Sequence, residues 1–340
     1  MLFRCQAVFL RAILKVSNDR KLTGVLLANT GTPDSPNPKD IKKYLKEFLS
    51  DRRIIKIPRI IWLPILYLII LNIRPYKKQK DYKKIWMKDG SPLLVLSKML
   101  LDNIKLKNTN KDIFYSIGMR YGNPSIASEL KNFQDIGIDN LLIFPMFPQY
   151  SFSTMESIRD EVLVSLKKMQ WNPKVNFIEE YYTEEDFINS TANQIRNSWN
   201  RHGRSNLLIF TYHGLPKRYI LDGDPYYDSC LKTSDFVAKK LNIKNDEYIS
   251  SFHSKFGFGE WTKPYTENLL LNLPKKGISH VDIISPTFSI DCLETLEEIE
   301  IQFKNDFIQA GGKKFNYIPC LNNSSDHINL IENLVNKHLE

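Results

Sequence analysis

Short apolar runs recur along the chain, and most of them end in a turn that is followed by a helical pattern of apolar residues. Continuous apolar runs of this length are typical of strands that are buried on both faces of a parallel sheet. The segments between the runs are long enough to form crossover helices. The eight runs are Gly24–Pro33, Ile113–Pro124, Asn140–Ser151, Lys174–Tyr182, Asn206–Pro216, Glu247–Gly257, His280–Asp291 and Lys314–Asn322.

The runs fall into two sets of four, which predicts an α/β fold with two similar domains, each a four-stranded parallel sheet flanked by helices. We expect the first domain at residues 21–182 and the second at residues 183–324. A C-terminal helix over residues 325–340 is expected to pack back on the first domain. Residues 1–20 are basic and are expected to form a poorly ordered extension, with a weak amphipathic anchor or a targeting segment as the alternative.

A second apolar segment, "IIWLPILYLIILNI" at residues 60–73, raises the question of membrane contact. It is too short to span a bilayer as a helix, it contains Pro64, and it lies between Arg59 and Arg74. One interpretation is a buried helix. The other is an exposed apolar lip that touches a membrane or receives a hydrophobic ligand.

Ligands of open α/β sheets bind outside the carboxyl ends of the strands, so the residues just after each run are the candidates for a site. The chain has no GxGxxG or GxxxxGK[ST] pattern for a nucleotide and no GxSxG elbow for a hydrolase. The candidate positions are Asn29–Pro33, Arg120–Tyr121, Gln149–Ser153, His213 and Asp291–Glu294.

Charge and cysteine content narrow the function further. The chain has 340 residues and a formal net charge of +9, but its lysines are scattered and no zinc-finger spacing, RNP-like motif or arginine-rich arm is present. Nucleic-acid binding is therefore disfavoured. None of the four cysteines, Cys5, Cys230, Cys292 and Cys320, forms a CxxC pair, which argues against a structural zinc or iron–sulfur site and indicates a reducing, cytosolic protein.

The segment "SIDCLETLEEIE" is the strongest acidic feature. A helix that begins near Asp291 places Asp291, Glu294 and Glu298 on one face, where like charges are unfavourable unless a cation or a proton compensates them. Glu297 and Glu300 then point elsewhere and are expected to be solvated. A plainer role for Asp291 is that of a helix N-cap.

His213, in "IFTYHGLP", stands where an apolar run stops and a turn begins. Both His213 and Glu294 follow a predicted strand of the second domain, so we expect them to meet across a cleft. Imidazole and carboxylate together suit Fe(II), Co(II) or Zn(II), but two ligands are too few for a tight structural site. An open site that passes a metal on fits better, and a buried core histidine is the alternative.

The chain resembles the ferrochelatases, and the resemblance covers about Leu22 to Asn322. It rests on several long motifs in the same order, among them "VLLANTGTPDSP", "RPYKKQKDYKKIWMKDGSPL", "MRYGNPSI", "FPQYSFST", "YHGLPKRYILDGDPYYDSC", "FHSKFGFGEWTKPYT" and "DCLETLEEI". The resemblance implies two Rossmann-like, chelatase-type domains with a porphyrin between them. It also implies a lyase of haem biosynthesis that inserts Fe(II) into protoporphyrin IX, with distortion of the ring and loss of two pyrrole protons.

Carried over position by position, the resemblance implies that His213 is the active-site histidine and that Glu294 is its partner at the iron. Glu298 matches the next acid on the same helix face. The resemblance is strongest to bacterial members without a C-terminal cysteine cluster, so we expect no iron–sulfur cluster and no tightly bound cofactor, with Fe(II) as a substrate. The implied porphyrin-binding positions are Arg74, Tyr82, Ser91, Arg120, Tyr121 and Thr30.

Three positions depart from the family pattern. Thr30 replaces a more usual hydrophobic residue, Phe152 stands where a small residue is common, and His253 stands where glutamine is expected. Thr30 and Phe152 are expected to alter the packing of the pocket. None of the three is expected to touch the His213–Glu294 pair.

The chemistry of the reaction assigns roles to these residues. We expect His213 to act as base and transient ligand, Glu294 as ligand and Glu298 as proton relay, with Arg74 or Arg120 pairing with propionates. The alternatives are a chelatase for another tetrapyrrole (coproporphyrin with iron, or sirohydrochlorin with cobalt) and a non-catalytic haem or porphyrin carrier. We expect small-molecule substrates, a cytoplasmic location with peripheral contact at the inner membrane through residues 60–73, and no nucleic-acid partner, while the oligomeric state is left open.

Overall fold

A computed structural model describes residues 21–257 and 259–339 of the chain. The expectations for residues 1–20, including Cys5, fall outside the described residues.

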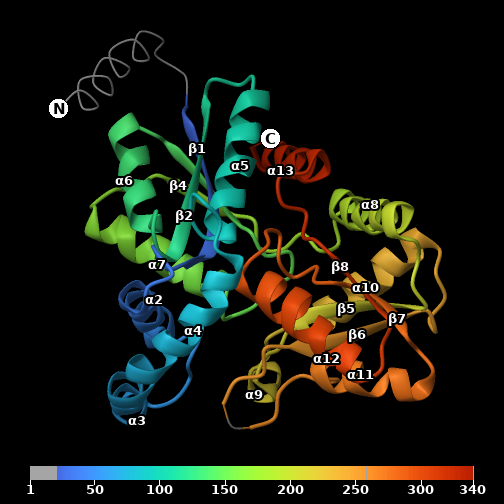
Figure 1. Ribbon diagram of the computed structural model, residues 1–340. Coiled ribbons are helices and arrows are strands. Elements are labelled where there is room, and N and C mark those ends of the chain that lie inside the picture. The colour runs from blue at the N-terminus through green and yellow to red at the C-terminus, as the bar shows by residue number, and fades with distance from the viewer. Residues whose placement is uncertain (1–20, 258, 340) are drawn as a thin grey trace.

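Two parallel sheets of four strands each form the centre of the structure (Figure 1). Each predicted apolar run coincides with one strand to within a residue at its start, so the expected fold class is confirmed. The strand orders are β2-β1-β3-β4 and β6-β5-β7-β8, which place the first strand of each half next to the second and the third. The strands are β1 (Thr23–Thr32), β2 (Ile113–Gly122), β3 (Asn140–Pro145), β4 (Lys174–Phe177), β5 (Leu207–His213), β6 (Tyr248–His253), β7 (His280–Ile284) and β8 (Lys314–Ile318).

Helices cover both faces of each sheet, because the strands are apolar on both sides. The helices of the first half are α2 (Pro38–Ser50), α3 (Arg59–Ile65), η1 (Leu66–Ile70), α4 (Leu71–Ile85), α5 (Pro92–Lys107), α6 (Ile126–Ile136) and α7 (Met155–Lys168). Those of the second half are α8 (Glu185–His202), α9 (Lys217–Leu221), α10 (Tyr226–Leu241), α11 (Thr266–Asn272), η2 (Pro274–Lys276), η3 (Glu294–Phe303), α12 (Lys304–Gln309) and α13 (Ser325–Leu339).

The last helix, α13, lies beside α5 of the first half (Figure 1). Its residues Ile331 and Leu334 belong to the apolar cluster that also contains Val25 and Leu27 of β1. The chain therefore returns to its first sheet after completing the second, and this packing links the two halves. The domain boundary at 182/183 stays a prediction.

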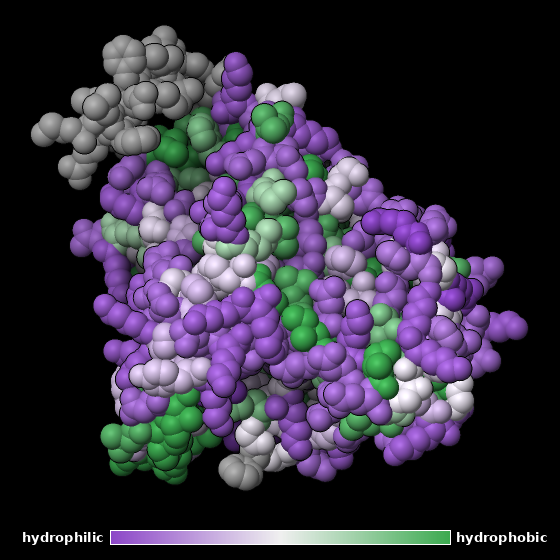
Figure 2. Space-filling model, in the orientation of Figure 1, coloured by the Kyte–Doolittle hydropathy of each residue, from purple (hydrophilic) through white to green (hydrophobic). Residues whose placement is uncertain are grey.

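The segment at residues 60–73 forms an exposed apolar lip, not a buried helix. It is built by α3, by the π-helical turn η1 and by the start of α4, with Ile60 exposed by 85% and Leu68 by 73%. Trp62 and Leu66 point inward and anchor the lip on α2. Figure 2 shows the exposed apolar residues as a green patch at the lower left, where Figure 1 places α3.

Of the described helices, the continuous one over Arg59–Ile85 is the one long and apolar enough to cross a membrane by length and composition. Only 22% of its most apolar window is buried inside the protein. Its second half carries six lysines and arginines from Arg74 to Lys84. The apolar part ends at Ile73 and is therefore about 22 Å long, which is shorter than a hydrocarbon core of about 30 Å.

Truncation of a core side chain of α13 tests the link between the two halves. Ile331 is fully buried, so Ile331→Ala is expected to lower the free energy of unfolding by about 2–5 kcal/mol, measured by urea denaturation. Asn336→Ala, at an exposed position of the same helix, is the control and is expected to stay within about 0.5 kcal/mol of the wild type. Equal stability of the two variants would contradict the packing described.

Candidate active site between the two sheets

His213 lies at the carboxyl end of β5, where the chain leaves the sheet. The next residue, Gly214, passes so close to β6 that its N–H donates to the carbonyl oxygen of His253 at 2.7 Å. A Cβ at position 214 would lie 2.8 Å from that oxygen and 3.2 Å from the Trp261 ring. Glycine is therefore required here by the close approach of two backbones, and this contact fixes the position of His213.

The tautomer of His213 is set by its own neighbour in the chain. The Nδ1 atom lies 2.8 Å from the carbonyl oxygen of Gly214. A carbonyl oxygen can only accept, so Nδ1 carries the proton and Nε2 carries the lone pair in the neutral ring. The side chain is half-buried, and its Nε2 is the nitrogen that can take up a proton or bind a metal.

A second histidine, His253, lies beside His213 at the end of β6. The two residues are paired in the parallel ladder, and their ring centroids are 5.9 Å apart. The expectation that His253 does not touch the His213–Glu294 pair was therefore wrong, because it contacts His213, and neighbouring parallel strands end at one edge. Phe288 completes the group, with its ring 6.4 Å from that of His213 and 6.1 Å from that of His253.

A chain of hydroxyl groups fixes the tautomer of His253 as well. The Thr266 hydroxyl donates to Ser251 at 2.9 Å, so the Thr211 hydroxyl donates to Thr266 and accepts from His253 Nδ1, also at 2.9 Å. The Nε2 atom of His253 is buried and has no hydrogen-bond partner among the described residues. Burial, and next the charge of His213, lower the pKa of His253 to about 3, although Glu294 acts in the opposite direction.

Glu294 and Glu298 lie on η3, which is a π-helix and not the predicted α-helix. In a π-helix the hydrogen bonds run from i to i+5, and such turns are frequent at functional sites. Glu298 accepts a hydrogen bond of 2.8 Å from the Ser254 N–H and a second bond from the Ser254 hydroxyl. Because Ser254 directly follows β6, these bonds attach η3 to the strand end that carries His253.

Asp291 does not share the face of Glu294 and Glu298, so this part of the sequence prediction was wrong. It precedes η3 and is 3% exposed. Its carboxylate accepts hydrogen bonds from the Tyr317 hydroxyl at 2.5 Å and from Asn322 Nδ2 at 2.7 Å. Asp291 therefore has a structural role, but the plainer alternative was wrong as well, because the N-cap of η3 is Leu293 and no side chain caps the helix.

Glu297 was expected to be solvated, and the structure contradicts this as well. Its side chain is 1% exposed and lies 2.6 Å from Lys84 Nζ, while Gln302 Nε2 donates to its other oxygen at 2.6 Å. The π-helix turns by a different angle per residue than an α-helix, so a face assignment based on a spacing of three and four residues fails. Glu300 is exposed, as expected.

Glu294 faces aromatic side chains of the first half. Burial raises the pKa of both Tyr44 and Tyr82, and the nearby charge of Glu294 raises each further. The thiol of Cys292, whose pKa burial also raises, is affected by the same carboxylate. Glu294 is half-buried, and its charge acts both on these tyrosines of α2 and α4 and on His253 at the end of β6.

Arg74 lies on α4 with its guanidinium 4.0 Å from the centre of the Phe256 ring, which belongs to the second half. Burial lowers the pKa of Arg74. In the described parts of the chain, it forms no ion pair and no hydrogen bond with another residue. A half-buried guanidinium of this kind has all its donors available for an anionic ligand.

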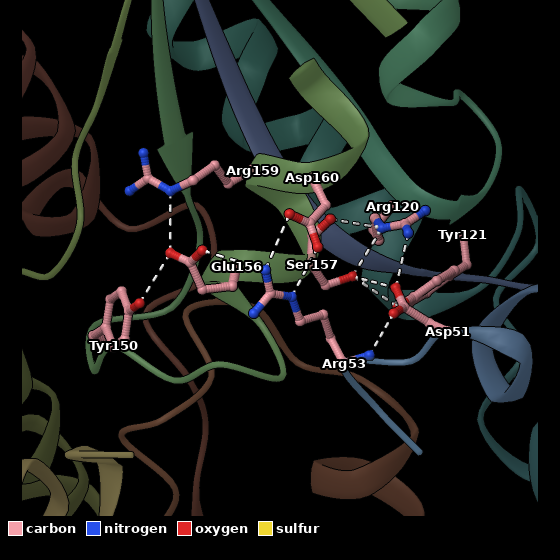
Figure 3. Close-up of polar contacts among 9 residues, drawn as sticks. All are labelled: Asp51, Arg53, Arg120, Tyr121, Tyr150, Glu156, Ser157, Arg159 and Asp160. Carbon is pink, nitrogen blue, oxygen red and sulfur yellow. Dashed lines mark hydrogen bonds and ion pairs between the residues drawn. The ribbon is translucent and has the colours of Figure 1, made fainter. Parts of the chain in front are cut away.

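Arg120 and Tyr121 take part in a polar network inside the first half (Figure 3). Arg120 donates to Asp51 at 2.8 Å, to Glu161 at 2.9 Å, and through Nε to the backbone and side chain of Ser157. The Tyr121 hydroxyl donates to Asp51 at 2.8 Å. Each guanidinium nitrogen of Arg120 is thus already bonded, so these contacts do not support its expected pairing with a propionate.

Two other expected porphyrin positions have local structural roles. Ser91 is 2% exposed and caps α5, where its hydroxyl oxygen accepts the Leu94 N–H at 3.3 Å. Thr30 is half-buried near the end of β1, and its N–H donates to the Asn29 side chain at 2.7 Å. Both lie at or near the end of a strand or helix, and neither offers a charged group.

No group of three or more His, Cys, Asp or Glu side chains within residues 21–257 and 259–339 is arranged to hold a metal ion. A site with His213 and Glu294 alone leaves most coordination positions to water or to a substrate.

Two residues at this site, His253 and Glu297, have no role predicted from the sequence. From the sequence, His253 stood out only as a departure from the family pattern. Its position at the end of a predicted strand could also have indicated that it lies at the ligand-binding edge. Glu297 has no such signal in the sequence, because its partner Lys84 is 213 residues away.

Comparisons with known proteins agree with these observations. The family model described as ferrochelatase matches residues 22–339. A ferrochelatase of Wigglesworthia glossinidia brevipalpis is 46% identical over 318 residues, which cover 93% of this chain and 98% of the relative. A ferrochelatase of Hydrogenovibrio crunogenus is 44% identical over 319 residues, with 92% and 84% covered.

Solved structures give the same fold at much lower identity. SirB from Bacillus subtilis with Fe3+ has a TM-score of 0.56 at 10% identity, with 93% of this chain and 95% of that chain covered. The sirohydrochlorin chelatase SirB in complex with cobalt has a TM-score of 0.55 at 9% identity, with 93% and 94% covered. At this identity the likeness shows the chelatase fold alone.

The two buried histidines, His253 and His327, predict a loss of stability in acid. Burial lowers their pKa values to about 3 and about 4. Below about pH 6.5 the unfolded chain therefore binds protons that the folded chain does not, and stability falls with pH by up to about 1.4 kcal/mol per unit for each histidine. We expect the free energy of unfolding in urea to fall less steeply between pH 7 and pH 4.5 for His253→Gln than for the wild type.

The control for this measurement is His202→Gln, since His202 is exposed. Its pH dependence of unfolding is expected to follow the wild type. Identical slopes for His253→Gln and the wild type would show that His253 takes up a proton in the folded protein as easily as in the unfolded chain.

Proposed function

The chain belongs to the ferrochelatase family and inserts iron into protoporphyrin in haem biosynthesis, and we propose that His213, Glu294 and Glu298 carry this reaction. Insertion has three obstacles. Two weakly acidic pyrrole protons must leave, the flat macrocycle must distort so that its nitrogens point toward the metal, and hydrated Fe(II) must lose water. Each obstacle corresponds to a group of residues in the site.

His213 is the proposed base. Its Nδ1 proton is held by the Gly214 carbonyl, so its Nε2 lone pair is available to accept a pyrrole proton near neutral pH. This fixed orientation is the single observation that carries the proposal. The same nitrogen serves as a transient ligand of Fe(II) at another step.

Glu294 is the proposed second ligand of the incoming Fe(II), which is a substrate and not a resident cofactor. A carboxylate and an imidazole bind Fe(II) well enough to remove water but too weakly to retain it. Glu298 lies four residues further along η3 and is held by Ser254. We assign to it the transfer of protons away from the ring.

The proposed porphyrin site lies between the aromatic residues of the first half and the second sheet. Tyr82 and Phe288 supply apolar walls for the macrocycle, and Arg74 supplies the guanidinium for a propionate. Contacts on the periphery of the ring provide the binding energy that supports its distortion. We assign Thr30, Ser91, Arg120 and Tyr121 to shaping the pocket wall, because their polar groups are engaged within the protein.

We also propose peripheral contact with the inner membrane from the cytoplasmic side. The lip at residues 60–73 exposes Ile60, Leu68 and their apolar neighbours, and exposed lysines such as Lys77 and Lys80 follow directly on α4. Apolar side chains next to basic ones favour binding to the surface of anionic bilayers. Such contact would bring the lip to the phase in which a hydrophobic porphyrin dissolves.

Removal of the proposed base is the direct test of the site. His213→Ala is expected to lower kcat for anaerobic Fe(II) insertion by at least about 100-fold, followed by absorbance, while porphyrin affinity from fluorescence titration changes little. His202→Ala, at an exposed position, should insert iron like the wild type. Metallation by His213→Ala at the wild-type rate would refute the proposed role.

The membrane contact is tested by vesicle co-sedimentation. The double variant Ile60→Ser/Leu68→Ser is expected to bind vesicles that contain phosphatidylglycerol at least about tenfold more weakly, because each side chain contributes on the order of 1.5–3 kcal/mol when fully buried in the bilayer. Leu106→Ser is the matched control, since Leu106 is 85% exposed but lies outside the lip. Unchanged binding by the double variant would exclude the lip as the contact.

A further inference from the structure

The ion pair between Glu297 and Lys84 joins the two halves of the protein at the site. The Glu297 side chain is 1% exposed, whereas that of Lys84 is 45% exposed. Their atoms are 2.6 Å apart, and the hydrogen bond from Lys84 raises the pKa of that lysine. Asp81, on the preceding turn of α4, lies 3.8 Å from the same ammonium group.

The two elements joined by this pair carry both parts of the proposed reaction. Lys84 stands on α4, together with Arg74 and Tyr82 of the proposed porphyrin site. Glu297 stands on η3, between Glu294 and Glu298. The ion pair therefore connects the helix that holds the ring with the helix that presents the carboxylates to it.

Burial of a carboxylate costs desolvation free energy, and a cation close to it offsets this cost. Lys84 is therefore expected to stay close to Glu297. Glu297 has one cationic partner in the described residues, and its other oxygen is bound by Gln302 of the same helical segment. Without the ammonium group the negative charge would remain buried and uncompensated, which is strongly unfavourable. The pair thus restrains the separation of α4 and η3 more firmly than an exposed ion pair does.

We propose that Lys84 and Glu297 form a positioning pair that sets the distance between the bound porphyrin and the carboxylates of Glu294 and Glu298. This inference rests on the roles proposed above for those two carboxylates. Lys84 and Glu297 are positioning residues, which act on the rate of insertion through the geometry of their neighbours. A shift of about 1 Å in a reacting group can lower a rate by about 100-fold.

Lys84→Met tests the pair because it removes the charge and keeps most of the length of the side chain. At saturating porphyrin and Fe(II), its kcat is expected to fall about tenfold or more, while the porphyrin Kd from fluorescence titration stays within about twofold. Lys83→Met, at an exposed neighbouring position without an ion pair in the described residues, should match the wild type. Lys84→Arg, which retains a cation, should restore most of the turnover.

A second pair of variants separates positioning from stability. Lys84→Met is expected to unfold at a lower temperature, because it leaves the Glu297 charge buried without a cation. The double variant Lys84→Met/Glu297→Gln removes that charge and should regain thermal stability, yet its kcat should remain low. Wild-type kcat in both Lys84→Met and the double variant would overturn the inference and leave the pair a purely structural contact.

The His213→Ala variant separates failure of the positioning inference from failure of the proposed catalytic roles. If His213→Ala inserts iron normally, the assigned chemistry fails. If His213→Ala is inactive while Lys84→Met turns over at the wild-type rate, the chemistry stands and only the positioning inference fails.

Discussion

The close approach of β5 and β6 at their carboxyl ends is the constraint on which the site depends. Gly214 has room for no side chain beyond a hydrogen, because the carbonyl oxygen of His253 and the Trp261 ring lie where a Cβ would be. The Gly214 N–H donates to the His253 carbonyl oxygen, so β5 and β6 end side by side at the same edge of the sheet. His213 is thereby held at the sheet edge, and the Gly214 carbonyl orients its ring so that Nε2 has no hydrogen-bond partner among the described residues.

The other part of the site consists of the carboxylates on η3, and burial of their charges decides which partners they have. Each carboxylate there has a different environment. Glu297 is buried against a lysine, Glu298 is held by Ser254, and Glu294 is half-buried opposite tyrosines. The energetic cost of a buried charge decides these environments, since a carboxylate loses its water only where a cation or hydrogen-bond donors replace it. Glu294, which has neither a lysine nor a backbone N–H as a partner in the described residues, is the carboxylate proposed to bind the metal.

Much of the fold could be predicted from the sequence, because parallel strands that are buried on both faces consist of continuous apolar runs. His213 and Glu294 could be proposed as site residues as well, since residues after such strands line the ligand-binding edge. The prediction failed where helical geometry changed. The spacing of Asp291, Glu294 and Glu298 assumes an α-helix, but Asp291 precedes the helix and the π-helical turn brings Glu297 inward.

Contacts between distant segments could not be read from any local pattern. Arg120 looked available for a propionate, yet Asp51, Ser157 and Glu161 already occupy its guanidinium. The sequence by itself determined the strands, their grouping into two halves and the residues at their ends, because these depend on local periodicity. Only the tertiary structure decided which charges are paired, which histidines touch and which carboxylate stays open, because burial and pairing depend on neighbours that lie far away in the chain.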